Sequence, residues 1–311
     1  MARANAVYYA THDPFADFIT APEISQAFGE VLGAWAAITW DAMGRPASVT
    51  FAEAGPGRGT LMADALRAVA RVAPDFRTAL HVHLVETSPR LRAIQAAAIP
   101  GAAWHDTLED LPPGPMILLA NEFLDALPIR QFVRRDTWQE RFVADGAWVE
   151  RQADAPPGLP GAAGEVAEYR DPALAAALGA RLRAQPGAAL FLDYGPAASG
   201  PGDSLQALRD GRPADPLAAP GAADLTAHVD FAAFARAAGV PAHGPIPQGK
   251  FLTRLGLFQR IDRLARTQPP RAAMAMVEGG RRLAEPDRMG ALFKAMVLTS
   301  PGLPVPAGFE A

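Results

Sequence analysis

The sequence predicts an α/β fold with a mostly parallel sheet and helices on both faces. Residues 49–54 form a short apolar run that leads through closely spaced glycines into a segment of helical period at 61–72. Two further apolar runs, 116–120 and 188–192, are typical of parallel strands buried on both faces. Half of the 311 residues are hydrophobic, which is enough for one large core.

The joint between the first strand and its helix is the turn Gly55-Pro56-Gly57-Arg58-Gly59, with Glu53 two residues upstream. Glycines permit positive φ angles and a close approach of the backbone to a ligand, and the helix that follows directs N–H groups at it. The G-x-G-x-G spacing differs from the G-x-G-x-x-G of dinucleotide sites and resembles the first motif of class I S-adenosylmethionine (SAM) methyltransferases. A purely structural turn stays the alternative.

Composition excludes several classes of function. A net charge of -4 without a basic stripe argues against nucleic acid as the main partner. The absence of cysteine excludes disulfides, thiolate metal sites and cysteine nucleophiles, and no metal site is expected. No apolar run approaches the about 20 residues of a membrane span, and the first residues lack the apolar core of a signal peptide, so we expect a cytoplasmic protein.

The amino-terminal segment 8–25 is aromatic and polar without helical period, which predicts a loop. A helix is expected to begin at Pro22-Glu23, with Thr20 as its cap and Glu23 completing a capping box. The helix either only packs in front of the sheet, or the loop, with Asp17 and Thr20, covers a ligand.

A second strand is expected at 79–86 and a third at 102–106. The second ends on Glu86, where a carboxylate can accept the two vicinal hydroxyls of a ribose. The third ends near the expected adenine, whose edge Asp106 could read. His81 and His83 alternate onto one strand face, which favours packing over metal binding.

The apolar strand 116–120 runs into Asn121-Glu122-Phe123-Leu124-Asp125. Two acids and an amide at the end of a buried strand are costly to desolvate unless they have a task. The strand at 188–195 also carries an acid and an aromatic residue at its end, Asp193-Tyr194. These ends are expected to converge.

The rest of the chain adds elaborations to one domain, residues 1–311. We divide it into an amino-terminal cap at 1–45, a core at 46–200 with a β-hairpin insertion at about 130–152, and a carboxy-terminal part at 201–311. Helices are expected at 174–183, 231–238, 248–263 and 272–284, and a last strand at 291–299. His228 is either catalytic or a core histidine.

With these motifs in place, the chain resembles the MidA family of SAM-dependent methyltransferases, whose mitochondrial members are complex I assembly factors that dimethylate an arginine. The resemblance runs from Tyr8 to Phe309, and five blocks carry it: 17–26, 53–62, 121–128, 192–195 and 224–231. It implies a class I SAM methyltransferase Rossmann-like fold with a seven-stranded sheet. Three departures are a short or absent helix before Tyr8, a short loop before Asp17, and Gly211-Arg212 where a histidine is expected.

The resemblance implies SAM as the cofactor and assigns roles on both sides of the site. Gly55, Gly57 and Gly59 would admit the methionine part, Glu53 would hold its amino end and Glu86 the ribose. Asp106 would lie at the adenine, while Asp17 and Thr20 would close the site. For an arginine acceptor, Glu122 would orient the guanidinium, with Asp125 second and Asn121 as the orienting amide.

The resemblance also implies a protein substrate such as a complex I subunit, without nucleic acid or membrane insertion. A homodimer is one possible assembly. For eukaryotic members of the family, the compartment equivalent to the bacterial cytoplasm would be the mitochondrial matrix. Two alternatives stay open: a methyltransferase acting on a small molecule, and a non-catalytic assembly chaperone that binds SAM. A nicotinamide dehydrogenase is disfavoured by the glycine spacing.

Overall fold

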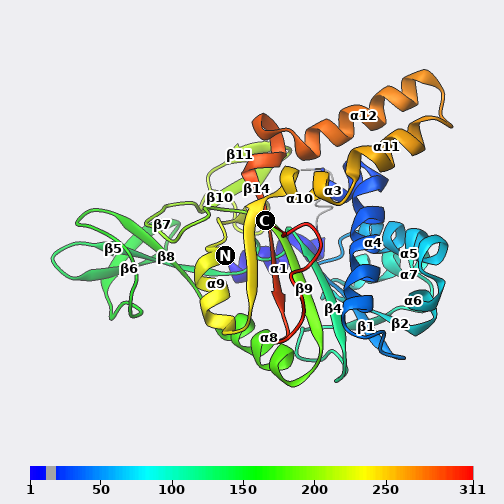
Figure 1. Ribbon diagram of the computed structural model, residues 1–311. Helices are drawn as coiled ribbons and strands as arrows, with labels where there is room; N and C mark the ends of the chain where they lie inside the picture. The colour runs from blue at the N-terminus through cyan, green and yellow to red at the C-terminus, as the bar shows by residue number, and fades with distance from the viewer. Residues whose placement is uncertain (12–18, 311) are drawn as a thin grey trace.

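The computed structural model describes residues 1–11 and 19–310. Its central sheet has seven strands in the order β13-β14-β9-β4-β1-β2-β3 (Figure 1). The five strands from β9 to β3 are parallel, and β14 runs antiparallel to both of its neighbours. The strands are β1 (Val49–Ala54), β2 (Leu80–Val85), β3 (Ala103–His105), β4 (Met116–Asn121), β9 (Gly187–Tyr194), β13 (Ala242–Pro247) and β14 (Phe293–Thr299). The predicted fold class is confirmed.

Two hydrophobic cores cover the two faces of this sheet. Side chains of a strand point to alternate faces, so Phe51 of β1 joins one core while Ala52 joins the other. The first core includes α4 (Gln26–Ala42) and α5 (Thr60–Val72). The second includes α8 (Ala173–Ala184) and α9 (Phe231–Ala238). Two shorter helices, α6 (Pro74–Ala79) and α7 (Pro89–Ala98), connect the strands beside α5 (Figure 1).

Helices α4 and α5 approach each other so closely that their contact needs glycine. A Cβ built on Gly29 would lie 2.7 Å from Asp64 Cβ, and one on Gly33 would lie 2.6 Å from the Ala65 carbonyl oxygen. Such distances are too short for a side chain, so the small residues of α4 set the helix spacing. This contact holds α4 and α5 together over one face of the sheet.

A four-stranded antiparallel sheet projects at the left of Figure 1. It has the order β7-β6-β5-β8 and consists of β5 (Ile129–Arg134), β6 (Trp138–Ala144), β7 (Ala147–Gln152) and β8 (Val166–Arg170). The expected hairpin insertion is therefore present and is extended by β8. A three-stranded sheet of β10 (Gln206–Arg209), β11 (Arg212–Ala214) and β12 (Asp224–Thr226) was not predicted.

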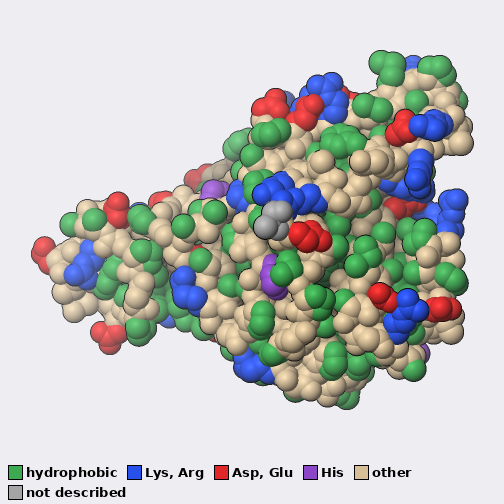
Figure 2. Space-filling view, viewed as in Figure 1, with side chains coloured by type: hydrophobic (Ala, Val, Ile, Leu, Met, Phe, Trp, Pro, Cys, Tyr) green, Lys and Arg blue, Asp and Glu red, His purple; other side chains and the backbone are tan. Residues whose placement is uncertain are grey.

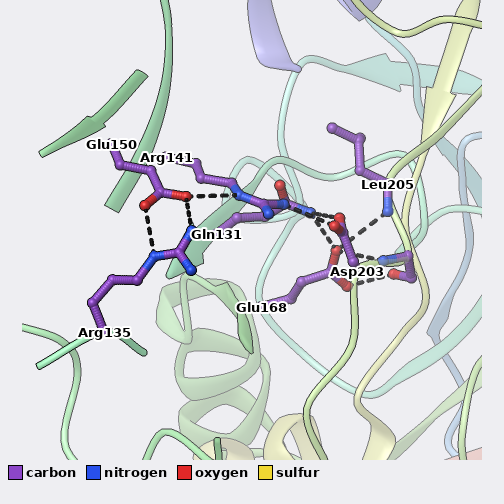
Figure 3. A network of polar contacts seen from close by, with 8 residues as sticks. Gln131, Arg135, Arg141, Glu150, Glu168, Asp203 and Leu205 are labelled. Atoms are coloured by element: carbon purple, nitrogen blue, oxygen red, sulfur yellow. Dashed lines mark hydrogen bonds and ion pairs between the residues drawn. The ribbon is translucent and has the colours of Figure 1, made fainter. Parts of the chain in front are cut away.

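Polar contacts join the projecting sheet to the segment just before β10 (Figure 3). Glu168 of β8 accepts the backbone N–H groups of Ser204 and Leu205, at 2.8 and 3.2 Å. Arg141 of β6 pairs with Asp203 at 2.8 Å. The connection that leads into β10 is thus held against the projecting sheet.

The amino-terminal segment differs from its prediction. Residues Ala2–Thr11 form helix α1, so the loop expected from Tyr8 onward is wrong over 8–11, and a helix does precede Tyr8, one of the two outcomes expected there. Residues 12–18 of the expected loop lie outside the described residues. A short helix α3 (Ala21–Ile24) is separated from α4 at Ser25, whose hydroxyl accepts the N–H of Ala27. Thr20 lies at the start of α3 but its side chain makes no capping bond, so the capping box is also wrong.

The carboxy-terminal helices form an arm at the upper right of Figure 1. The segment predicted as one helix is two, α10 (Gln248–Arg254) and α11 (Leu257–Ala265), separated at Gly256, whose φ is +84°. They are followed by α12 (Pro270–Ala284) and a kinked turn, η1 (Pro286–Gly290), in which Arg288 has non-helical backbone angles. Among the described residues, no helix combines the length and apolar character that a membrane crossing requires. On the face shown in Figure 2, cationic and acidic side chains are interspersed.

Candidate active site

A cavity of about 1230 Å³ lies at the carboxyl ends of the parallel strands. The glycine turn after β1, Glu86 after β2 and Glu122 after β4 all line it. Tyr194 at the end of β9 lines it too. This is the edge of an open α/β sheet at which ligands bind, and the predicted convergence of the strand ends is confirmed.

The glycine turn has the left-handed backbone that its sequence requires. The φ angles of Gly55, Gly57 and Gly59 are +65°, +55° and +81°. Gly59 occupies the N-cap position of α5 without a side-chain cap, so the first N–H groups of that helix face the turn. A Cβ on Gly59 would lie 2.9 Å from Ile99 Cδ1, so the turn also packs closely against the Ile99 side chain.

Glu53, at the end of β1, is a buried acid at the wall of the cavity. Its side chain is 3% exposed, and its Oε2 finds no hydrogen-bond partner among the described residues. Burial raises the pKa of Glu53 to about 8, although a hydrogen bond from the Met62 N–H opposes that rise. A ligand ammonium would satisfy this oxygen, and the residues present therefore fit the amino end of a SAM molecule.

Glu86 is held in place by its neighbours on α7. Its Oε1 accepts the N–H of Ser88 at 2.8 Å, and its Oε2 accepts from Gln95 Nε2 at 3.3 Å. Burial raises the pKa of Glu86. Asp106 also lines the cavity, but its side chain is 75% exposed and forms an ion pair with Arg92 at 2.6 Å. Asp106 is thus much less confined than Glu86.

The backbone of Glu122 is left-handed, with a φ of +50°, which turns the chain sharply after β4. Its Oε1 accepts hydrogen bonds from Asn121 Nδ2 at 3.0 Å and from the N–H of Ala21 at 3.3 Å. Burial and the nearby charge of Asp125 raise the pKa of Glu122 to about 7. The start of α3 and the end of β4 therefore meet at this carboxylate.

Two other acids lie beside Glu122. Burial and the charges of Asp193 and Asp224 raise the pKa of Asp125 well above its ordinary value, and its Oδ1 finds no hydrogen-bond partner among the described residues. Asp224 of β12 accepts a hydrogen bond from the Tyr9 hydroxyl at 2.7 Å. Asp125 and Asp224 both line the cavity, and both act electrostatically on Glu122, so three carboxylates gather at the end of β4, next to the glycine turn that follows β1.

Several residues of this cavity were missed by the sequence prediction. Tyr9 and Asn5 of α1 line it, and Asn5 Nδ2 donates to the carbonyl groups of Ala126 and Leu225. Glu23 lines it and accepts from the Thr60 hydroxyl at 2.5 Å. Glu23 lies inside the block 17–26 of the resemblance, whereas Asn5 and Tyr9 lie outside all five blocks and had no such signal. Predicted residue Thr20 lines the cavity, whereas Asp17 lies outside the described residues.

The structure contradicts the core alternative for His228, which is exposed, and leaves its catalytic role a prediction. His228 lines the cavity and stacks edge-on against Tyr194, with ring centroids 5.6 Å apart. His83 contacts His105 at 2.8 Å between ring nitrogens. Among the described residues, no cluster of three or more metal-ligating side chains occurs.

A family model of S-adenosyl-L-methionine-dependent methyltransferases, Methyltransf_28, matches residues 31–246. The chain belongs to this family. It is 33% identical to the protein arginine methyltransferase NDUFAF7 of Danio rerio over 92% of this chain and 78% of that protein. The corresponding protein of Homo sapiens is 34% identical over 94% of this chain and 76% of that protein. Both are named as mitochondrial.

Two solved structures are similar to this chain over most of its length. A COG1565 superfamily protein from Burkholderia thailandensis bound to S-adenosyl-homocysteine (SAH) has a TM-score of 0.77 and 29% identity, covering 94% of this chain and 81% of that one. A native structure from the same organism has a TM-score of 0.79 and 29% identity, covering 99% and 88%. The chain is a SAM-dependent methyltransferase, and the predicted cofactor is confirmed.

Proposed function

We propose that this methyltransferase transfers its methyl group to an arginine side chain of a protein. The observation that carries the proposal is the gathering of Glu122, Asp125 and Asp224 on one side of the cavity. Asp125 has an oxygen without a partner among the described residues, as does Glu53 at the end of the neighbouring strand β1. Each of these two acids would be satisfied by a cationic group of a ligand.

Carboxylates suit an arginine acceptor for a specific chemical reason. The guanidinium is charged at neutral pH, and its nitrogen lone pairs are delocalised. A carboxylate that forks onto two N–H groups fixes the guanidinium plane and draws positive charge away from the third nitrogen. We assign this role first to Glu122, second to Asp125, and the orientation of Glu122 to the Asn121 amide, whose Nδ2 contacts it.

Bound SAM supplies a methyl group activated by its sulfonium. The residues of the chain then need to align the acceptor nitrogen with that carbon, which is an effect of orientation. For the transfer to balance, the charged guanidinium would have to give up one proton when its nitrogen is methylated. Glu122, with a pKa of about 7, is suited to receive that proton near neutral pH.

On the cofactor side, we assign the methionine part of SAM to Gly55, Gly57 and Gly59, and its ammonium to Glu53. Glu86 would accept the ribose hydroxyls and Asp106 would lie near the adenine. Thr20 would help to close the site. Two observations support these assignments: Oε2 of Glu53 has no hydrogen-bond partner among the described residues, and the Glu86 carboxylate is held by the Ser88 N–H.

The size of the cavity favours two ligands in one site. Its volume of about 1230 Å³ exceeds the roughly 300 to 1,000 Å³ of a typical small-molecule pocket. There is room for the cofactor together with the end of an acceptor side chain. The curated relatives, named as protein arginine methyltransferases, support the same acceptor class.

The acceptor protein is proposed on the resemblance alone. We propose a respiratory complex I subunit, as for the mitochondrial members of the resembling family. The expected homodimer and cytoplasmic location stay predictions.

Purified complex I incubated with the protein and methyl-labelled SAM tests the proposal. A parallel incubation replaces complex I with a metabolite extract filtered to retain only small molecules, with a cut-off on the order of 3 kDa. Label recovered as methylarginine after acid hydrolysis of protein is the expected result. Label recovered only in the metabolite fraction would instead establish a small-molecule methyltransferase. SAM binding without any transfer would favour a chaperone.

A further inference from the structure

Gln95 of α7 lies beneath the cofactor side of the cavity and is fully buried. Its Nε2 donates to the Gly57 carbonyl at 2.7 Å and to Glu86 Oε2 at 3.3 Å. Its Oε1 accepts from the Trp104 indole N–H at 2.9 Å. One amide thus contacts the glycine turn, the carboxylate after β2 and a side chain of β3.

The chemistry of its partners dictates how this amide is oriented. An indole N–H can only donate a hydrogen bond, and a backbone carbonyl can only accept one. The oxygen of Gln95 must therefore face Trp104, and its NH2 group must face Gly57 and Glu86. Because a buried amide without partners is costly, the reversed orientation is strongly disfavoured.

The bond to the Gly57 carbonyl also orients the glycine turn. In a planar trans peptide the carbonyl and the next N–H point in opposite directions. With the Gly57 carbonyl held toward Gln95, the Arg58 N–H lies on the side of the turn away from Gln95. Gly57 and Arg58 both line the cavity, so the amide sets which backbone group the turn presents.

We propose that Gln95 is a positioning residue that couples the glycine turn to Glu86. It would hold the binding groups for the methionine end and for the ribose of one SAM molecule at a fixed separation, while Trp104 sets the orientation of its amide. This inference rests on the cofactor roles proposed above for Gly57 and Glu86. It assigns Gln95 no contact with the cofactor itself.

The isosteric variant Gln95→Glu tests this coupling, because it removes both N–H donors and keeps an acceptor for Trp104. We expect calorimetric SAH affinity to fall at least about tenfold, because the variant loses both the 2.7 Å bond to the Gly57 carbonyl and the longer bond to Glu86. The matched control is Gln248→Glu, since Gln248 is equally buried, donates to the Leu283 carbonyl and does not line the cavity. The control should change SAH affinity less than twofold.

A second ligand separates positioning from general destabilisation. The Kd of the 2′-deoxyribose analogue of SAH divided by the Kd of SAH measures how strongly the site prefers a ligand with the 2′-hydroxyl. If Gln95 positions Glu86, Gln95→Glu should lower this ratio. An unchanged ratio, with both affinities equally weakened, would overturn the inference. Should Gln95→Glu not fold, Trp104→Phe removes the orienting N–H together with part of the ring that packs on the core, and the ratio should still fall, by about two- to fivefold. An unchanged ratio in Trp104→Phe would then overturn it.

Glu86→Gln distinguishes failure of this inference from failure of the proposed cofactor site. If Glu86→Gln abolishes the discrimination between the two ligands and Gln95→Glu does not alter it, only the role of Gln95 is wrong. If Glu86→Gln leaves the discrimination intact, the ribose role of Glu86 is wrong, and the coupling falls with it.

Discussion

Oδ2 of Asp193 accepts the backbone N–H of Asp125 at 3.2 Å, and also that of the preceding Leu124 at 2.9 Å. Its Oδ1 accepts the N–H of Tyr194 at 2.9 Å. One buried acid of β9 therefore shapes the turn that carries another acid into the cavity. Asp193 and Asp125 look equivalent in the sequence, but the first serves the backbone and the second faces the cavity.

Replacing Asp193 should destabilise the protein. Asp193→Asn keeps the shape of the side chain but turns an NH2 group toward donors that need an acceptor. We expect a loss of about 2 to 4 kcal/mol in the free energy of unfolding, because buried N–H groups lose their partners. Urea unfolding measures this loss. A change within 0.5 kcal/mol, roughly the effect of a neutral surface substitution, would show that the turn does not depend on Asp193.

SAH binding should strengthen as the pH rises from 6 to 8. The pKa of Glu53 is about 8, so the carboxyl group is mostly protonated at pH 6 and must release that proton before it pairs with an ammonium. The affinity should rise by at most about tenfold for each pH unit and level off above pH 8. Calorimetry at each pH measures this rise.

Glu53→Gln provides the control for that pH profile. The variant cannot ionise, so its SAH affinity should be low and nearly independent of pH over the same range. If it shows the same slope as the original protein, another group controls the pH dependence.

The stability of the ligand-free protein should show the opposite trend. Burial raises the folded-state pKa values of Glu53 to about 8 and of Glu122 and Asp193 to about 7, above those of the unfolded chain. The folded state therefore holds more protons than the unfolded state between pH 4 and 8. The stabilisation is full below the unfolded pKa of about 4 and is lost as the pH rises through the folded values.

Thermal unfolding from pH 5 to 8.5 checks this trend, with the melting temperature expected to fall as the pH rises. Glu53→Gln should flatten the upper part of the curve. A melting temperature that rises across this range would mean that the three acids are ionised in the folded protein at low pH.

Glu122→Gln should abolish methyl transfer and leave SAH affinity within about twofold, because the amide can neither localise charge on a guanidinium nor take up its proton. Label incorporation into the acceptor and calorimetry of SAH measure the two effects separately. Glu278→Gln, an exposed acid on α12 that pairs with Arg288, is the matched control and should retain activity. Full transfer by Glu122→Gln would remove Glu122 from the mechanism.

Gly57→Val should abolish SAH binding. The φ of Gly57 is +55°, which a β-branched residue adopts only with strain, and its side chain would enter the space that the backbone leaves at the cavity. Gly146→Val is the control, because Gly146 has a φ of +73° in open space in the projecting sheet. Both positions have a positive φ that strains a valine, so equal SAH affinity in the two variants would argue against the cradle assignment.

Local patterns were sufficient for much of the fold. The apolar runs of β1, β4 and β9 had few alternatives, and a glycine turn between a strand and a helix has a characteristic spacing. Residues that follow parallel strands reach one edge of the sheet, so the proximity of Glu86 and Glu122 followed from the strand prediction.

Local patterns failed where long-range contacts decide structure. Helix α1 has almost no apolar periodicity, and it is held by Asn5 and Tyr9 through bonds to residues more than 100 positions away. The break at Ser25 and the small sheet of β10, β11 and β12 depend on tertiary contacts in the same way. The contact between Gln95 and the glycine turn could not be predicted from the spacing of the motifs.

By itself, the sequence determined the family, the cofactor and the α/β fold, because these depend on the apolar runs of the strands, the glycine spacing and the acids at strand ends. Only the tertiary structure decided what each polar side chain does. It separates Asp193, whose oxygens are occupied by backbone N–H groups, from Asp125, which keeps an oxygen without a partner among the described residues. The physical reason is that a buried carboxylate takes its character from its hydrogen-bond partners, and the folded chain supplies these from distant segments.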